Sequence, residues 1–257
     1  MRAAPSSVAE MNWTTLVLEL FVTTLGILVA LALNSWWGAR QDRARERVYL
    51  RQLTADIDRT LDASNLPEAV AEETRSTDAT TALLRAFRSE HAPPTDSIAR
   101  WLYDAEAFKT FTPLTGTACA LISTRDISLI RDDSIRALIV AMVALVDGNA
   151  IQIHDYQLKW QAQAEELERN TDYIALKALV LGPEATDAAA RTDSMFEIPS
   201  SPRREPFPAT DYDALLRTRD VYRAIVKMNT AHKNTLELLR RELDGLRTVR
   251  PLFARMR

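Results

Sequence analysis

The sequence predicts an all-α protein in which one N-terminal transmembrane helix is followed by a helical bundle. Three observations lead to this fold class. A long apolar segment lies near the N-terminus, apolar residues recur at three- and four-residue intervals further on, and only six of the 257 residues are glycine. Because tight β-turns and phosphate-binding loops depend on glycine, this composition disfavours an all-β fold and a nucleotide-binding fold.

The apolar segment covers residues 13–37, after a short tail at residues 1–12. Glu19 is the only charged residue between Met11 and Ala39. As a helix the segment would be roughly 37 Å long, enough to cross a hydrocarbon core of about 30 Å. Two alternatives stay open: a cleaved signal peptide with the small-residue pattern Ala30-Leu31-Ala32, and a buried helix of a soluble protein.

The two ends of the segment carry residues suited to a membrane interface. Trp13 stands at one end, and Trp36, Trp37 and Arg40 stand at the other. Basic residues are scarce before the segment and frequent after it, which predicts a cytoplasmic domain and an outer N-terminus. Abundant arginine favours a bacterial source, so we expect the bilayer partner to be a bacterial inner membrane. The arginines that follow the segment are Arg40, Arg43, Arg45, Arg47 and Arg51.

Small and polar residues of the apolar segment share one helical face. At about 100° per residue they fall within a strip about 80° wide, while the other faces carry large apolar side chains. The four-residue spacing of Gly26 and Ala30 lets two helix backbones approach closely. We therefore expect helix–helix contact here, with a second copy or another membrane protein. Glu19 has two other interpretations, an ion or proton site and a shallow position near the headgroups. The strip comprises Glu19, Thr23, Gly26, Ala30 and Asn34.

Residues 38–257 are expected to form one soluble helical domain with a long proline-containing loop near residues 187–208. The last helix has a near-heptad, coiled-coil-like apolar stripe through Ile225, Met228 and Leu239. We expect this stripe to pack on a central core helix at Ile135–Val146, which is apolar nearly all round. The expected helices are 41–63, 67–88, one from Thr95 or Asp96 through Leu102, a short buried helix around 119–122, 135–146, 151–170, and one from Thr210-Asp211 to Pro251.

The anchor pattern resembles a bacterial family of single-pass membrane proteins known only as a domain of unknown function (number 6090). The shared pattern is Glu19, Gly26-Ile27-Leu28, Ala30-Leu31, Asn34 and Trp36, followed by an arginine-rich helix with Tyr49-Leu50. A mid-chain segment, residues 121–130, is also similar, but Arg125 stands where the family has glycine. The resemblance implies an N-terminal anchor and a helical domain, and it implies no activity.

The sequence contains no catalytic, cofactor-binding or metal-binding motif that we would assign. His91 and His154 stand alone, and His232 is expected to be a hydrogen-bonded core residue. Cys119 is expected to be inert packing, and the paired aspartates, Asp56/Asp58, Asp132/Asp133 and Asp211/Asp213, are expected to be helix caps or solvated side chains. The net charge of −3 disfavours a nucleic-acid partner.

These observations favour a non-enzymatic, membrane-anchored interaction protein, either a scaffold or a regulatory subunit. A single-pass sensor that binds a small ligand inside the bundle is the alternative. A polar cluster around His154 and Trp160 would favour the sensor, whereas a sealed apolar core with an exposed apolar patch would favour the interaction protein.

Overall fold

The computed structural model describes residues 13–62, 65–109, 111, 113–182 and 210–255, and every regular element in these residues is a helix. The all-α class is therefore confirmed for this part of the chain, in which no strand occurs. The elements are α1 (Trp13–Thr60), α2 (Leu66–Ala86), α3 (Thr95–Glu106), α4 (Gly116–Ser123), the 3-10 helix η1 (Asp126–Leu129), α5 (Asp133–Glu168), α6 (Tyr173–Leu181), α8 (Tyr212–Leu215) and α9 (Arg219–Ala254).

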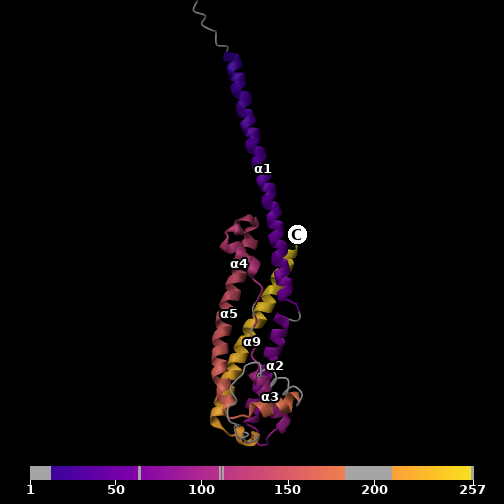
Figure 1. Ribbon diagram of the computed structural model, residues 1–257, viewed down its shortest axis with the longest axis vertical. Helices are drawn as coiled ribbons and strands as arrows, with labels where there is room; N and C mark the ends of the chain where they lie inside the picture. The colour runs from indigo at the N-terminus through magenta and orange to yellow at the C-terminus, as the bar shows by residue number, and fades with distance from the viewer. Residues whose placement is uncertain (1–12, 63–64, 110, 112, 183–209, 256–257) are drawn as a thin grey trace, which may run out of the picture.

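Three long helical rods make an elongated bundle (Figure 1). The first rod consists of α1 and α2 in succession, and the other two are α5 and α9. Helix α9 is central, since it packs against α5, α2 and the inner part of α1. Helix α3 packs on α2, α6 and α8 at the end of the bundle farthest from the outer part of α1.

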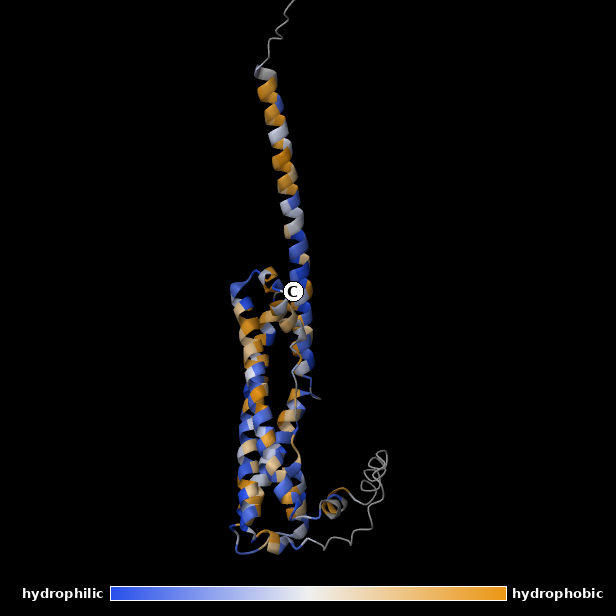
Figure 2. Cartoon of the chain, turned by 60° about the vertical axis from the view of Figure 1, so that its left-hand side comes forward, coloured by the Kyte–Doolittle hydropathy of each residue, from blue (hydrophilic) through white to orange (hydrophobic). Residues whose placement is uncertain are grey.

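Helix α1 changes its environment along its length. It has 48 residues, which makes it about 72 Å long. Every side chain from Leu16 to Trp37 is exposed, although most are apolar, whereas Leu50, Leu53 and Ile57 are buried in the bundle. Figure 2 shows this change as an apolar outer part followed by a hydrophilic stretch. The boundary expected between residues 37 and 38 therefore lies inside one continuous helix.

Helices α1 and α5 are both long and apolar enough to cross a membrane. In the apolar stretch of α5, 28% of the residues are buried, whereas none is buried in that of α1. Ile135, Ile139 and Met142 face the core, but Val140 and Leu145 of the same helix are exposed. The expected core helix therefore exists but presents only one face to the core. Its expected bounds were wrong, because one continuous helix, Asp133–Glu168, covers 135–146 and nearly all of the expected helix 151–170.

Several other expected helix ends differ from the structure. Pro94, rather than Thr95 or Asp96, is the N-cap of α3. Asp211 caps the short helix α8, and α9 begins only at Arg219. Pro251 lies inside α9 and does not end it, because the buried ring of Phe253 holds the final turn against the bundle. The loop expected near 187–208 lies entirely outside the described residues.

The core consists of two apolar clusters with polar side chains between them. The α1 cluster joins α1, α4, the first part of α5 and the last part of α9. The α3 cluster joins the end of α2, α3 and the first part of α9. Between them, α2 and α9 contribute a set of buried polar side chains that we call the polar layer: Glu73, Ser76, Thr77, Thr80, Asn229, His232 and Thr235.

Arg125, before η1, has a left-handed backbone conformation with φ of 65°. It is the only described non-glycine residue with positive φ. Glycine adopts this conformation without the steric cost that a Cβ brings.

Candidate functional site

The predicted contact strip on α1 is fully exposed. Glu19, Thr23, Gly26, Ala30 and Asn34 all lie on the outer part of the helix, and a Cβ added at Gly26 would meet no atom within 4 Å. The Thr23 hydroxyl donates a hydrogen bond to the Glu19 carbonyl oxygen at 2.8 Å, within the same helix. Its oxygen remains able to accept a hydrogen bond from a partner.

The strip points away from the bundle. When α1 is projected at about 100° per residue, the buried residues Leu50, Leu53 and Ile57 lie on the side roughly opposite to Gly26 and Ala30. The same projection continues the strip downward through three exposed residues, Ala44, Val48 and Gln52. One face of α1 is thus uncovered from the outer part into the bundle.

The predicted interface residues are exposed as well. Trp13, Trp36 and Trp37 present their indole rings to the surroundings. The guanidinium carbon of Arg40 lies 5.8 Å from the centre of the Trp36 ring, a cation–π distance. This contact keeps the charge of Arg40 near the end of the apolar stretch.

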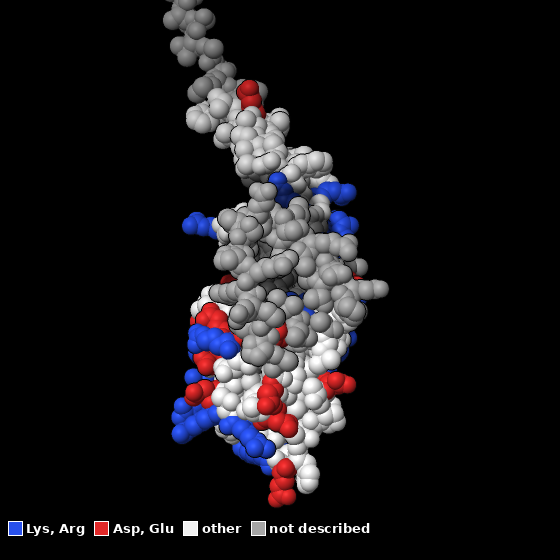
Figure 3. Space-filling view, turned by 60° about the horizontal axis from the view of Figure 1, so that its bottom comes forward, with Lys and Arg blue, Asp and Glu red and all other residues white. Residues whose placement is uncertain are grey.

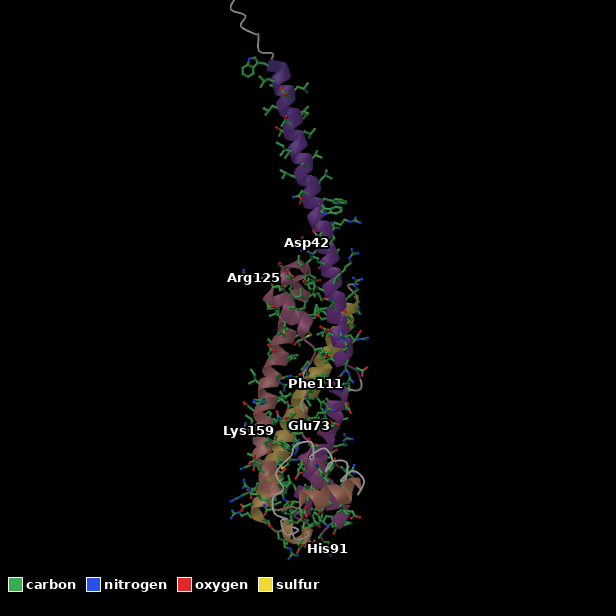
Figure 4. All side chains as sticks on the ribbon, in the orientation of Figure 1. Asp42, Glu73, His91, Phe111, Arg125 and Lys159 are labelled. Atoms are coloured by element: carbon green, nitrogen blue, oxygen red, sulfur yellow. The ribbon has the colours of Figure 1, made fainter. Side chains whose placement is uncertain are left out.

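The polar layer is built around His232 and Glu73, both fully enclosed by the bundle. Nδ1 of His232 lies 2.7 Å from a carboxyl oxygen of Glu73, and Nε2 lies 3.0 Å from the carbonyl oxygen of Ala105. The indole N–H of Trp160 donates to the same carbonyl at 3.2 Å. The ring of Phe108 lies against both Trp160 and His232. Figure 4 shows Glu73 midway along the bundle, far from His91 at its end.

The contacts of His232 fix where its protons lie. A carbonyl oxygen can only accept a hydrogen bond, so Nε2 carries the hydrogen that points to Ala105. The second ring nitrogen and Glu73 then share one proton, and the pair is neutral overall wherever that proton resides. Burial raises the pKa of Glu73, and the hydrogen bond to His232 opposes that rise. The second carboxyl oxygen of Glu73 has no hydrogen-bond partner among the described residues.

Asn229 ties α9 to α2 one turn away from His232. Its amide donates to the hydroxyl oxygens of Thr80 at 2.9 Å and Thr81 at 3.0 Å, and lies 3.4 Å from the carbonyl oxygen of Thr77. These directional contacts connect fixed positions on the two helices. They therefore define how α2 and α9 align along their axes.

A second buried carboxyl group lies within the apolar α1 cluster. Glu242 on α9 accepts one hydrogen bond, from the Asn149 amide of α5 at 3.3 Å. Burial raises the pKa of Glu242 to about 7, and the hydrogen bond from Asn149 opposes this rise. The other carboxyl oxygen has no hydrogen-bond partner among the described residues.

The remaining candidate residues take structural or solvated positions. The expectation for His232 is confirmed, whereas the expectation for Cys119 is wrong, because its side chain is exposed. Asp132 and Asp211 cap α5 and α8 as expected. No group of three or more potential metal-ligating side chains occurs within the described part of the chain.

Sequence reasoning found His232 but missed the two buried carboxyl groups. Glu73 occupies an apolar-face position of α2, four residues after Ala69 and seven after Leu66. Glu242 interrupts the apolar stripe of α9 between Leu239 and Leu246. An acidic residue at a core position of a helical repeat was the signal that could have identified both.

A polar cluster around His154 and Trp160 is the feature that would favour a sensor, and the polar group that the structure contains includes only Trp160 of these two residues. Trp160 does take part in it, but His154 is exposed on α5, and His232 and Glu73 supply the polar groups.

Comparison of the chain with family models, with curated proteins and with solved structures found no match.

Proposed function

We propose that this protein is a membrane-anchored, non-enzymatic interaction protein whose outer α1 serves both as anchor and as association surface. One observation carries the proposal: from Leu16 to Trp37 a mainly apolar helix has no covering protein, yet it continues without a break into a packed bundle. Such a surface is stable in hydrocarbon and costly in water.

The anchor proposal also fits the distribution of charge. Charged side chains are dense from Arg40 onward and nearly absent before it. Together with Trp36 and Trp37, this sequence of residues suits a helix that leaves the bilayer at its domain side. We place that domain in the cytoplasm of a bacterium, because arginine-rich flanks favour the cytoplasmic side of an inner membrane.

The uncovered strip supports association with a second copy or with another membrane protein. Gly26 and Ala30 leave room for close approach of a second helix, and Asn34 supplies an amide that lipid cannot satisfy. Because the bundle packs on the opposite side of α1, a partner helix along the strip would not collide with it. The exposed Ala44 and Val48 would extend the contact beyond the bilayer.

Disulfide crosslinking between copies tests this surface. In a Cys119→Ser background, Ala30→Cys places a thiol on the strip, whereas Ala32→Cys places one on the opposite face at nearly the same depth. We expect mild oxidation of membranes to crosslink the Ala30→Cys protein at least several-fold more than the Ala32→Cys protein. Crosslinks from Ala30→Cys to a different protein would identify a heteromeric partner at the same surface.

Equal crosslinking at the two positions would reject the strip as an association surface. A protein released from membranes by alkaline carbonate would reject the anchor itself. A phosphatase reporter fused after Arg257 should stay inactive if the domain is cytoplasmic, and activity of that fusion would reverse the proposed orientation.

A sensor is the second candidate, favoured by a surface hollow beside the polar layer. Ser76 and Phe108 line this hollow together with Arg100 and Lys109, and the Phe108 ring separates it from His232. Its mixture of acidic and basic side chains suits a zwitterion such as an amino acid. Amino acids at millimolar concentration should raise the melting temperature of the purified full-length protein, and Arg100→Gln should reduce that rise. A panel of amino acids that leaves melting unchanged would reject this candidate.

A further inference from the structure

A basic groove lies where α1 leaves its apolar stretch. It is lined by residues of α1 and by Arg131, which precedes α5 and folds back against α1. In Figure 3 the first basic side chains appear just below the apolar outer part of α1, on more than one side of the molecule. The groove contains four guanidinium groups and one carboxylate: Arg40, Arg43, Arg47, Arg131 and Glu46, together with Trp36 and Ala44.

The single carboxylate in the groove is already engaged. Glu46 accepts a hydrogen bond from the backbone N–H of Arg131 at 2.8 Å, and its other oxygen lies 3.7 Å from the Arg131 Nε. Arg131 also donates to the carbonyl oxygen of Ala39 at 3.3 Å, which fixes its side chain beside α1. The loop before α5 therefore places the positive charge of Arg131 beside the three arginine charges of α1.

The three arginines on α1 have no acidic partner. Arg40, Arg43 and Arg47 are all exposed, and none has a carboxylate within ion-pair distance among the described residues. Their spacing of three and four residues places them on one side of the helix. Three uncompensated guanidinium groups on one side, with the fixed Arg131, make a concentrated site for an anion.

The outer end of the groove, at Arg40 and Arg43, lies close to the headgroup layer, whereas Arg47 lies about 16 Å beyond Trp36. By helical rise, Arg40 lies about 6 Å and Arg43 about 10 Å beyond Trp36 along α1. The polar region of a bilayer extends roughly 5–8 Å beyond the hydrocarbon on each side. The flexible arginine side chains reach back toward that layer, and the Arg40–Trp36 contact directs one of them there.

We propose that this groove binds the phosphate of an anionic phospholipid headgroup, from the leaflet on the side of the bundle. The inference rests on the proposed membrane anchor, and it adds a defined lipid site to it. Guanidinium groups bind phosphate through two parallel N–H donors. The phosphate of a zwitterionic headgroup already has an ammonium group beside it, so we expect such a lipid to bind the groove more weakly than an anionic lipid does. The bound lipid would link α1 to the Arg131 loop.

Matched arginine variants of the full-length protein test the site. Arg40→Gln and Arg43→Gln each remove one charge from the outer end of the groove, while Arg45→Gln removes the same charge from an exposed position outside it. Native mass spectrometry of the detergent-solubilised protein, titrated with phosphatidylglycerol or phosphatidylcholine, counts bound lipid. We expect preferential binding of phosphatidylglycerol, weakened roughly fivefold by each groove variant and unchanged by Arg45→Gln.

The outcomes separate this proposal from the anchor. Suppose that the protein stays in carbonate-washed membranes. Equal binding of the two lipids, or equal loss of phosphatidylglycerol binding in Arg43→Gln and Arg45→Gln, would then reject the lipid site in the groove but not the anchor. Displacement of phosphatidylglycerol by an equal concentration of inorganic phosphate would assign the groove to a free anion and also overturn the lipid site. Release of the protein by carbonate would reject the anchor, whatever the groove binds.

Discussion

Two neighbouring stretches of α9 contribute to the core in opposite ways. Residues 221–228 enter the α3 cluster with Val221, Ile225 and Met228, which need only apolar cover. The next two turns enter the polar layer with Asn229 and His232, which need partners at defined positions. Apolar packing supplies most of the free energy of folding but tolerates sliding, whereas directional hydrogen bonds do not. The polar layer therefore sets the alignment of α2 and α9.

The two buried carboxyl groups extend this comparison. Glu73 faces a histidine that can share its proton, so the pair stays neutral at little cost. Glu242 faces only an amide, and so it avoids a buried charge by remaining protonated up to a pKa of about 7. The difference predicts that the effect of Glu73 on folding stability depends mainly on His232, whereas the effect of Glu242 depends mainly on pH.

Met228→Asp gives the largest expected effect, because it places a charge in the α3 cluster. Met228 is fully buried among the apolar side chains of that cluster. We expect a loss of at least about 4 kcal/mol in the free energy of unfolding, enough to unfold the bundle. Circular dichroism during thermal melting measures it. Val226→Asp, on the exposed side of the same turn, is the control and should melt nearly like the wild type.

His232→Leu breaks the polar layer from its centre. The substitution leaves Glu73 buried without its partner, so we expect a loss of about 3 kcal/mol in unfolding free energy, measured by urea denaturation. Replacing both residues, as Glu73→Leu with His232→Leu, should recover most of that loss because no unpaired carboxyl group remains. A double variant as unstable as the single one would show that the pair does not interact as the geometry indicates.

Glu242 predicts a stability that falls with rising pH. Its pKa is raised in the folded state from 4.5 to about 7, so the folded protein binds more protons than the unfolded chain between these values. The associated stability is fully present below about pH 4.5 and is lost as the pH rises through about 7, by about 2 kcal/mol between about pH 5 and 8. Urea denaturation at these two pH values should show a smaller difference for Glu242→Gln. Part of the pH dependence of stability should remain in that variant, because the pKa of Glu73 is also raised.

Arg125→Gly gives the smallest expected effect, and it is a stabilising one. The left-handed conformation at Arg125 costs a residue with a Cβ up to about 1 kcal/mol, which glycine avoids. The larger entropy of glycine in the unfolded chain offsets part of this gain. We expect a melting temperature a few degrees above the wild type, and a lower melting temperature would contradict the inferred strain.

The sequence by itself determined the elements whose cause is local. Periodicity of apolar residues predicted the helical class and the core position of His232, and the continuous apolar run predicted a first helix over residues 13–37. Capping aspartates Asp132 and Asp211 were also predictable, because a helix start depends on a few neighbouring residues. The end of α9 was not predictable. Pro251 locally favours a helix end, but Phe253, two residues later, packs against residues far away in the sequence and keeps the last turn helical.

Only the tertiary structure decided which residues meet. Glu73 and His232 are 159 positions apart, and no local pattern pairs them. The same holds for Arg131, which lies 85 positions after Glu46 and completes a groove that α1 alone only begins. The tertiary structure also distinguished the two apolar helices, because the outer part of α1 is uncovered whereas α5 is partly buried. Hydropathy measures the tendency of a segment to leave water, whereas its actual cover depends on the helices that fold against it.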